Sequence, residues 1–285
     1  MRILLTGKDG QVGWELERAL APLGEVVAMD RSALDLADVD AIRRVVGDTK
    51  PAVVVNAAAY TAVDRAESEP ELAMRINGVA PGVLAEEAKR LGALLVHYST
   101  DYVFDGTKAT PYVENDAPNP INAYGRSKLA GERAIAAAGG AHLILRTSWV
   151  YAPRGRNFFL TIASRARAGE ALRVVDDQRG VPTSAAFLAA ATAALLRRTD
   201  RAELRETYHL VPAGQTSWCG FARAIVRLLD LPVEVAAIGS AAFPTPAARP
   251  KNSVLDATRI ARDLGVERPP WEALLADCVM TYLRE

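Results

Sequence analysis

The chain has 285 residues, of which 50% are hydrophobic and 24% are charged, and 34 Lys and Arg balance 34 Asp and Glu. This composition is typical of a globular protein with a sizeable core, arranged as one large domain or two modest ones. Zero formal net charge argues against a general binder of nucleic acid or of anionic membranes, although a local basic patch stays open. We therefore expect no nucleic acid and no membrane among its partners.

Cysteines and histidines show no pattern of a metal or disulfide site. Cys219 and Cys278 are far apart, which favours reduced thiols in a cytoplasmic protein. His97, His142 and His209 follow or interrupt apolar runs without metal-ligand spacing, so we expect core histidines and no metal site from them. The N-terminal residues show no long apolar targeting segment, which also favours a cytoplasmic location.

In the first half of the chain, short apolar runs alternate with helical patterns. The predicted strands are Arg2–Leu5, Glu25–Met29, Ala52–Asn56, Leu94–Tyr98 and Leu143–Arg146. The predicted helices are Gly13–Leu20, Val39–Val46, Glu71–Leu91 (kinked or divided) and Ala123–Ala138. Strands that are apolar throughout indicate a parallel sheet covered on both faces. The fold class is therefore α/β, a doubly wound parallel sheet of the Rossmann type, with a dinucleotide-binding domain over residues 1–148.

The second half is divided by prolines and glycines into shorter pieces. Its predicted helices are Phe158–Ala168, Ala185–Arg197, Phe221–Leu229 and Trp271–Leu283. We expect residues 149–183 and 212–285 to form a smaller C-terminal α/β substrate-binding region. Residues 184–211 are expected to return to the dinucleotide-binding domain.

A glycine-rich turn follows the first predicted strand and opens the first helix. Gly7 permits a tight turn, Gly10 allows the backbone to approach a pyrophosphate, and Gly13 allows close packing of helix on sheet. Gln11 and Val12 lie at the helix N-terminus, whose free N–H groups attract phosphates. The spacing G-x-x-G-x-x-G differs from the dehydrogenase fingerprint G-x-G-x-x-G, but its place between strand and helix predicts a cofactor site.

The ends of the next two strands supply further candidate cofactor contacts. Asp30 could accept hydrogen bonds from an adenosine ribose and so favours NADH, whereas Arg31 could pair with the 2′-phosphate of NADPH. The two residues favour different cofactors, so the choice between NADPH and NADH stays open. Other expected cofactor contacts are Asp35 and Leu36 beside the adenine, and Ala57, Ala58, Ala59, Tyr60 and Thr61 after the third strand.

Tyr124 and Lys128 stand four residues apart on a predicted helix, and residues at this spacing share one face. A cation beside a phenol lowers the pKa of the phenol, which would make Tyr124 an acid or base usable near neutrality. Asn122 is expected to cap the start of this helix, and Gly139 to stop it. Thr100, at the end of the fourth strand, could hydrogen-bond a substrate carbonyl and complete a Thr–Tyr–Lys set.

Several longer segments give these features a family context. The chain resembles the extended short-chain dehydrogenase/reductases and, within them, the dTDP-4-dehydrorhamnose reductases, nearly from end to end. The segments that carry the resemblance are residues 7–16 (GKDGQVGWEL), 56–64 (NAAAYTAVD), 99–104 (STDYVF), 146–151 (RTSWVY) and 244–253 (PTPAARPKNS).

The resemblance implies reduction of the C4 ketone of dTDP-4-dehydro-L-rhamnose by NADPH or NADH, with a nucleotide sugar as the small-molecule substrate. Tyr124 would supply the proton, Thr100 would polarise the ketone, and Lys128 would lower the pKa of Tyr124 and hold the nicotinamide ribose. The resemblance also places Tyr124 and Lys128 at the cofactor. Expected substrate contacts are Val63, Thr100, Asp101, Tyr102, Tyr124, Trp149 and, toward the diphosphate, Arg249, whose alternative is a solvated loop charge.

Some members of the resembled family form dimers linked by Mg²⁺ through acidic side chains. Glu15 matches one such position, but residues 185–194 offer no second carboxylate, so a bound Mg²⁺ ion stays open without a complete set of expected ligands. A monomer or a homodimer is expected. Two alternatives stay open: a nucleotide-sugar dehydratase or epimerase, which the Tyr102 that follows Asp101 argues against, and an NADP-binding regulatory subunit of methionine adenosyltransferase, which Tyr124 argues against.

Overall fold

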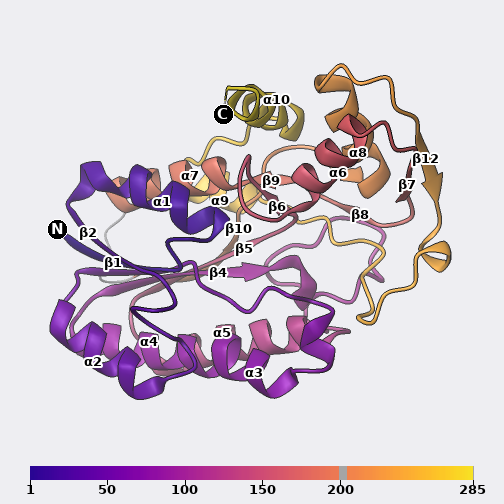
Figure 1. Ribbon diagram of the computed structural model, residues 1–285. Coiled ribbons are helices and arrows are strands. Elements are labelled where there is room, and N and C mark those ends of the chain that lie inside the picture. The colour runs from indigo at the N-terminus through magenta and orange to yellow at the C-terminus, as the bar shows by residue number, and fades with distance from the viewer. Residues whose placement is uncertain (199–203, 285) are drawn as a thin grey trace.

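The computed structural model describes residues 1–198 and 204–284 (Figure 1). Residues 199–203, within the predicted returning segment 184–211, and residue 285, at the end of the predicted substrate region, lie outside the described residues. Within the described residues, six parallel strands form the central sheet. From one edge to the other these are β10 (Arg205–His209), β5 (His142–Thr147), β4 (Leu94–Thr100), β3 (Val53–Asn56), β1 (Arg2–Thr6) and β2 (Glu25–Met29).

Helices cover both faces of this sheet, as the continuously apolar strands require. Ile3, Leu4 and Leu5 of β1 are all fully buried, and the same holds for the matching residues of β3. On one face α1 (Gln11–Leu20) packs against α7 (Ala185–Arg198). On the other lie α2 (Val39–Thr49), α4 (Ala80–Arg90) and α5 (Ala123–Ala138) (Figure 1). This arrangement confirms the predicted α/β class and the doubly wound parallel sheet.

The long helical stretch predicted over Glu71–Leu91 is divided, as its Gly and Pro residues indicated. It consists of α3 (Pro70–Met74), a π-helical turn η3 (Arg75–Val79) and α4. Asn77, inside the π turn, accepts a hydrogen bond from the Tyr60 backbone N–H at 2.8 Å and donates to the Tyr60 carbonyl at 2.9 Å. The irregular turn therefore fixes the backbone of the segment that follows β3.

The C-terminal half is built of shorter elements. Helix α8 begins at Trp218, earlier than the predicted Phe221, because the Ser217 side chain caps it by accepting from the Gly220 N–H at 2.9 Å. No helix in residues 1–198 or 204–284 is both long and apolar enough to cross a membrane. The remaining elements are β6 (Val150–Tyr151), α6 (Phe158–Arg167), β7 (Leu172–Val175), β8 (Arg179–Gly180), β9 (Thr183–Ser184), β11 (Thr216–Ser217), α8 (Trp218–Leu228), β12 (Val235–Ile238), α9 (Thr258–Leu264), α10 (Trp271–Tyr282) and the short 3₁₀ turns η1 (Ala21–Leu23), η2 (Arg65–Glu67), η4 (Asp101–Val103) and η5 (Ser240–Ala242).

A second hydrophobic cluster lies apart from those of the sheet, under α6, α8 and α10. It includes Phe159, Phe221 and Leu275, each fully buried, and Trp271. The two largest sheet clusters instead centre on the apolar strands and the helices that cover them. Among the described residues this cluster is thus separate from those of the sheet, and residues of both kinds of cluster line a cleft.

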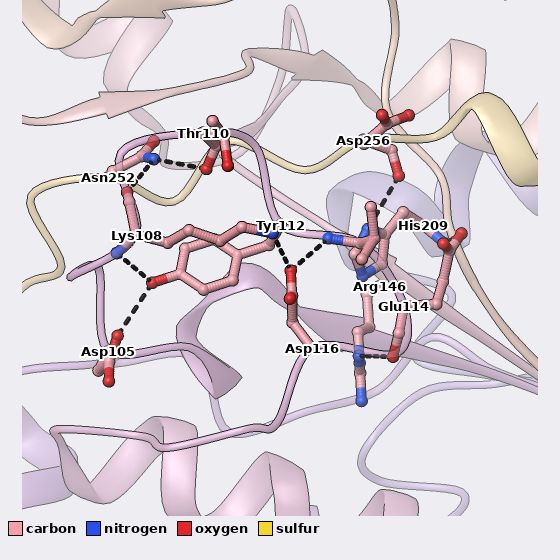
Figure 2. A network of polar contacts seen from close by, with 11 residues as sticks. Asp105, Lys108, Thr110, Tyr112, Glu114, Asp116, Arg146, His209, Asn252 and Asp256 are labelled. Carbon is pink, nitrogen blue, oxygen red and sulfur yellow. Dashed lines mark hydrogen bonds and ion pairs between the residues drawn. The ribbon is translucent and has the colours of Figure 1, made fainter.

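A polar network anchors the segment between β4 and α5 (Figure 2). The Tyr112 hydroxyl donates to Asp105 at 2.9 Å, and Lys108 pairs with Asp116 at 2.6 Å. The Asn252 side-chain amide donates to the Lys108 carbonyl at 2.7 Å (Figure 2). The contact with Asn252 ties the segment after η4 to a distant part of the chain.

Candidate functional site

A cleft of about 790 Å³ opens at the carboxyl ends of the parallel strands. The strand order reverses between β1 and β3, which is where doubly wound sheets bind their ligands. All but two of the residues expected at cofactor or substrate line this cleft, and the two that do not are Gly13 and Arg249. The lining residues among those expected are Gly7, Gly10, Gln11, Val12, Asp30, Arg31, Asp35, Leu36, Ala57, Ala58, Ala59, Tyr60, Thr61, Val63, Thr100, Asp101, Tyr102, Tyr124, Lys128 and Trp149.

The glycine turn between β1 and α1 forms one end of the cleft. Gly7 has a φ of +76°, a left-handed conformation that favours glycine. Gly13 lies behind the turn, where a Cβ would come within 1.9 Å of the Gly7 carbonyl oxygen. Gly10, by contrast, faces the cleft at the start of α1. The turn therefore leaves backbone and the helix N-terminus open to a phosphate group, without a side chain in between.

Charged residues gather beside the end of β2. Asp30 accepts hydrogen bonds from the Ser32 hydroxyl at 2.6 Å and the Ala33 N–H at 3.0 Å, and it pairs with Lys8 at 3.2 Å. These partners, the Ser32 hydroxyl first, hold the pKa of the Asp30 carboxyl well below its ordinary value. The carboxylate is consequently ionised at neutral pH, with Lys8 beside it and Arg31 next in the chain.

Helix α5 presents Tyr124 and Lys128 to the cleft, with the ends that the sequence predicts. The Asn122 side chain accepts from the Gly125 N–H at 2.7 Å, and Gly139 ends the helix with a φ of +68°. Lys128 is only 2% exposed, and burial lowers its pKa to about 8. Tyr124 departs from expectation, because burial raises its pKa to about 12 and a hydrogen bond with Thr100 only partly offsets this. The expected lowering of the phenol pKa by Lys128 is thus wrong for this structure.

Thr100 and Asp101 lie at the end of β4, where the chain turns into η4. The Thr100 hydroxyl donates to Asp101 Oδ1 at 3.0 Å and accepts from the Tyr102 N–H at 3.1 Å. Asp101 is 2% exposed, and burial raises the pKa of its carboxyl to about 7. A hydrogen bond with the nearby Ser253 lowers that pKa to a lesser degree. Asp101 therefore changes charge close to neutral pH.

Buried polar atoms without a hydrogen-bond partner concentrate at this cleft. Among the described residues they include Asp101 Oδ2, Thr147 Oγ1 and the Tyr151 hydroxyl, and all three residues line the cleft. Buried polar groups are normally paired, so unpaired ones that face a cavity indicate a site for a polar ligand. A sugar or ribose, which carries several hydroxyls, matches such a surface.

Two stacked indoles, Trp149 and Trp218, form an aromatic wall of the cleft. The Trp149 ring stacks on Trp218 with centroids 3.6 Å apart and an interplanar angle of 8°. Trp149 has a φ of +47°, and a Cβ at Gly180 would lie 2.4 Å from its indole. Trp218 was not predicted, nor was Phe158. The place of Trp218 just before a predicted helix is a weak indication of a site residue. Nothing in the sequence shows that Trp218 faces Trp149.

Arg249 lies outside the cleft lining and forms a two-pronged ion pair with Asp64. Its guanidinium nitrogens are 3.0 and 2.9 Å from the Asp64 carboxylate oxygens. Its expected role toward a diphosphate stays a prediction. As for metals, the described residues contain no group of three or more His, Cys, Asp or Glu side chains placed to hold an ion.

The doubly wound sheet, the glycine turn at its switch point and the Tyr–Lys pair in one cleft define a class, the nicotinamide-dependent short-chain dehydrogenase/reductases. The family model for the RmlD substrate binding domain matches residues 1–284. With this match and the relatives described next, the chain belongs to the dTDP-4-dehydrorhamnose reductase family.

Similar proteins cover the whole chain. A dTDP-4-dehydrorhamnose reductase of Burkholderia thailandensis is 49% identical, with 100% of both chains covered, and that of Salmonella typhimurium is 44% identical over 95% of each. The crystal structure of dTDP-4-dehydrorhamnose reductase from Bacillus anthracis, in complex with NADP, has a TM-score of 0.93 at 34% identity and covers 98% of this chain and 99% of that one. A UDP-glucose 4-epimerase of Thermotoga maritima, with a TM-score of 0.85 at 21% identity, shares the fold.

Proposed function

We propose that this protein reduces the C4 ketone of dTDP-4-dehydro-L-rhamnose to dTDP-L-rhamnose with NADPH or NADH, the last step of dTDP-rhamnose formation. The observation that carries the proposal is one cleft that joins the glycine turn to Thr100, Tyr124, Lys128 and an aromatic wall. The names of the full-length relatives supply the substrate. The nearby NADP complex supports the cofactor class.

The residues of the cleft fit a nicotinamide dinucleotide. An open backbone at Gly10 suits the pyrophosphate, and the cluster of Lys8, Asp30 and Arg31 suits the adenosine ribose. When bound, the cofactor supplies the hydride. Lys8 partly compensates the ionised Asp30, and Arg31, which lies 3.6 Å from Asp35, adds a second cation, so the cluster can accept a ribose hydroxyl or a 2′-phosphate, and we propose that both cofactors are used.

Three residues are proposed to act on the ketone. The Thr100 hydroxyl polarises its oxygen by donating a hydrogen bond, for which it turns away from Asp101. Tyr124, whose raised pKa keeps it protonated at neutral pH, donates the proton that the new hydroxyl needs. The Lys128 ammonium holds the nicotinamide ribose.

The organisation of the chain fits separate binding of the cofactor and of the sugar. We propose that residues 1–148, joined by the described part of 184–211, bind the dinucleotide, while 149–183 and 212–284 bind the sugar. The pairing of β10 with β5 and the separate cluster around Phe159 support this. Cys219 and Cys278 are buried thiols outside any disulfide of the described residues, which supports a cytoplasmic location. A monomer or a homodimer is proposed, to be measured by light scattering.

The decisive assay follows oxidation of NADPH and NADH with dTDP-4-dehydro-L-rhamnose, which a dehydratase and an epimerase generate from dTDP-glucose in the same tube. Cofactor oxidation that requires the complete system, with dTDP-rhamnose as product, is the expected result. Demonstrated cofactor binding without turnover would instead point to another keto sugar or to a regulatory subunit. Comparing the two cofactors gives the preference directly.

A further inference from the structure

A chain of buried polar side chains runs across the sheet and ends at Lys128. The Thr6 hydroxyl of β1 contacts Asn56 Oδ1 of β3 at 2.7 Å. Asn56 Nδ2 lies 3.0 Å from His97 Nδ1 of β4, and His97 Nε2 lies 3.1 Å from Lys128 Nζ. All four residues are at most 2% exposed, and the roles proposed above for the cleft leave three of them without a function.

These buried polar side chains matter because Lys128 has only a few hydrogen-bond donors. An ammonium has three N–H donors. One goes to the Tyr98 carbonyl at 2.6 Å and one is directed at His97 Nε2. Only one donor remains for the cleft, which Lys128 lines. Two protein contacts thus fix where Nζ sits, and the Tyr98 carbonyl alone would leave it free to swing.

This row of polar side chains can satisfy Lys128 in either charge state, because the side chains can exchange their donor and acceptor roles. With a charged Lys128, His97 Nε2 accepts, its proton sits on Nδ1, and Asn56 turns its amide oxygen toward the ring. With a neutral Lys128, the amide nitrogen faces His97, as in the orientation described above. The Thr6 hydroxyl can donate or accept and so closes the chain in both cases. An amide does not pass a proton onward, so the chain positions Lys128 and does not relay protons.

Other charges near Lys128 are already neutralised. Glu132, one turn further along α5, raises the pKa of Lys128, but it is held by Arg146 of β5 through bonds of 2.9 and 2.7 Å. His97 of β4 contacts Lys128 directly, and Tyr124, one turn earlier on α5, lines the same cleft. Burial keeps the pKa of His97 well below its ordinary value. His97 is consequently neutral and able to accept.

We propose that His97 is the positioning residue for Lys128: through Nε2 it accepts a hydrogen bond from the ammonium and, backed by Asn56 and Thr6, fixes the lysine for its work in the cleft. This inference rests on the proposed role of Lys128. It gives His97, which the sequence indicated only as a core histidine, a part in the reaction.

Two variants of similar size separate positioning from packing. His97→Gln carries an amide oxygen out to the place of Nε2, whereas His97→Asn reaches only the place of Nδ1 and cannot touch Lys128. We expect His97→Asn to lower kcat on the order of 10- to 100-fold and to move the alkaline limb of its pH profile to lower pH, because the lysine loses an acceptor that favours its charged form. His97→Gln should restore both to within about threefold.

A control variant measures the effect of simply weakening the same strand. Thr192→Val removes the buried hydrogen bond of 2.6 Å to the Tyr98 hydroxyl of β4 without touching Lys128. It should leave kcat and the pH profile near those of the wild type. Equal kcat and pH profiles for the Asn and Gln variants, or a matching loss in Thr192→Val, would overturn the proposal.

The dissociation constants of His97→Asn and His97→Gln for NADPH give a second comparison, because their measurement requires no turnover. His97→Asn should weaken NADPH binding at pH 7 and His97→Gln should not. If the wild type shows no reduction of the sugar nucleotide, the proposed function fails while this binding test still decides the role of His97. If Lys128→Ala binds NADPH as tightly as the wild type, the lysine itself has no role at the cofactor, and the inference falls with it.

Discussion

At the scale of single residues, Tyr124 and Lys128 show how burial reverses a simple expectation. Their i, i+4 spacing places them in one cleft, but the desolvation of the phenol outweighs its hydrogen bond with Thr100, and its pKa rises to about 12. A protonated phenol is the form that can give a proton to a reduced ketone. The raised pKa therefore keeps Tyr124 in the form that the proposed reduction needs.

Replacement of Tyr124 by Phe removes this proton donor and little else. We expect kcat to fall by about 10²- to 10⁴-fold, the usual contribution of general acid catalysis. The dissociation constant for NADPH should change less than about threefold, since the ring remains in place. Steady-state kinetics and a cofactor titration measure the two quantities. Turnover equal to that of the wild type would remove Tyr124 from its proposed role.

The raised pKa of Asp101 predicts that the free energy of unfolding depends on pH. Its pKa is raised to about 7 from an ordinary value of 3.8, so the native state binds the proton more tightly than the unfolded chain. The stabilisation is complete below pH 3.8 and is lost as the pH rises toward 7. Asp101→Asn cannot titrate. Between pH 4 and 8 its free energy of unfolding should therefore rise relative to the wild type, by at most about 4 kcal/mol.

Urea unfolding of both proteins across this pH range checks the prediction. The difference between the two proteins isolates Asp101 from other titrating groups. A difference that does not vary with pH would show that the carboxyl titrates normally in the folded protein.

At the scale of elements, the glycine turn separates packing from binding. Gly13→Ala would force a Cβ to within 1.9 Å of the Gly7 carbonyl, so we expect a loss of stability of about 1–3 kcal/mol or more. At Gly10 a Cβ meets only that carbonyl at 3.2 Å, and the backbone has an ordinary φ of −75°. Gly10→Ala should keep its stability but weaken NADPH binding at least about tenfold, because the methyl group faces the expected pyrophosphate.

Thermal unfolding and a cofactor titration on both variants test this pair. Equal losses of stability in the two would mean that Gly10, too, is needed for packing. Unchanged NADPH affinity in Gly10→Ala would place the pyrophosphate elsewhere in the cleft.

The sequence predicts most of these elements because their signals are local. Helix α5 is predicted from cap to stop, since the Asn122 cap and Gly139 are both local features. The fold class follows from the apolar strands, and most of the cleft lining follows from their carboxyl ends. Contacts between distant segments could not be foreseen: the stacking of Trp218 on Trp149 and the ion pair of Arg249 with Asp64 each join residues more than sixty positions apart. The raised pKa of Tyr124 belongs here too, because burial depends on the whole fold.

At the scale of the whole molecule, the separation of the cluster under α6, α8 and α10 from those of the sheet predicts separable effects of mutation. Phe159 is fully buried in the cluster under α6 and α8, so Phe159→Ala should cost about 3–5 kcal/mol. Below its unfolding transition, this variant should raise KM for the sugar nucleotide more than the dissociation constant for NADPH. Leu84→Ala, in a sheet cluster, is the matched control and should not show this selectivity. Equal effects of Phe159→Ala on both ligands would mean that this cluster and those of the sheet act as one unit.

The stacked indoles also give the molecule a built-in optical probe. Trp149 and Trp218 form part of the wall of the cleft that the dihydronicotinamide ring is proposed to enter. Trp14, clasped between the guanidinium groups of Arg18 and Arg154, lies in the helix that begins at the glycine turn. Indole emission overlaps the near-ultraviolet absorption of reduced nicotinamide. Loading of the site should therefore quench tryptophan fluorescence and sensitise the cofactor's own emission, so that binding can be followed in real time without a label.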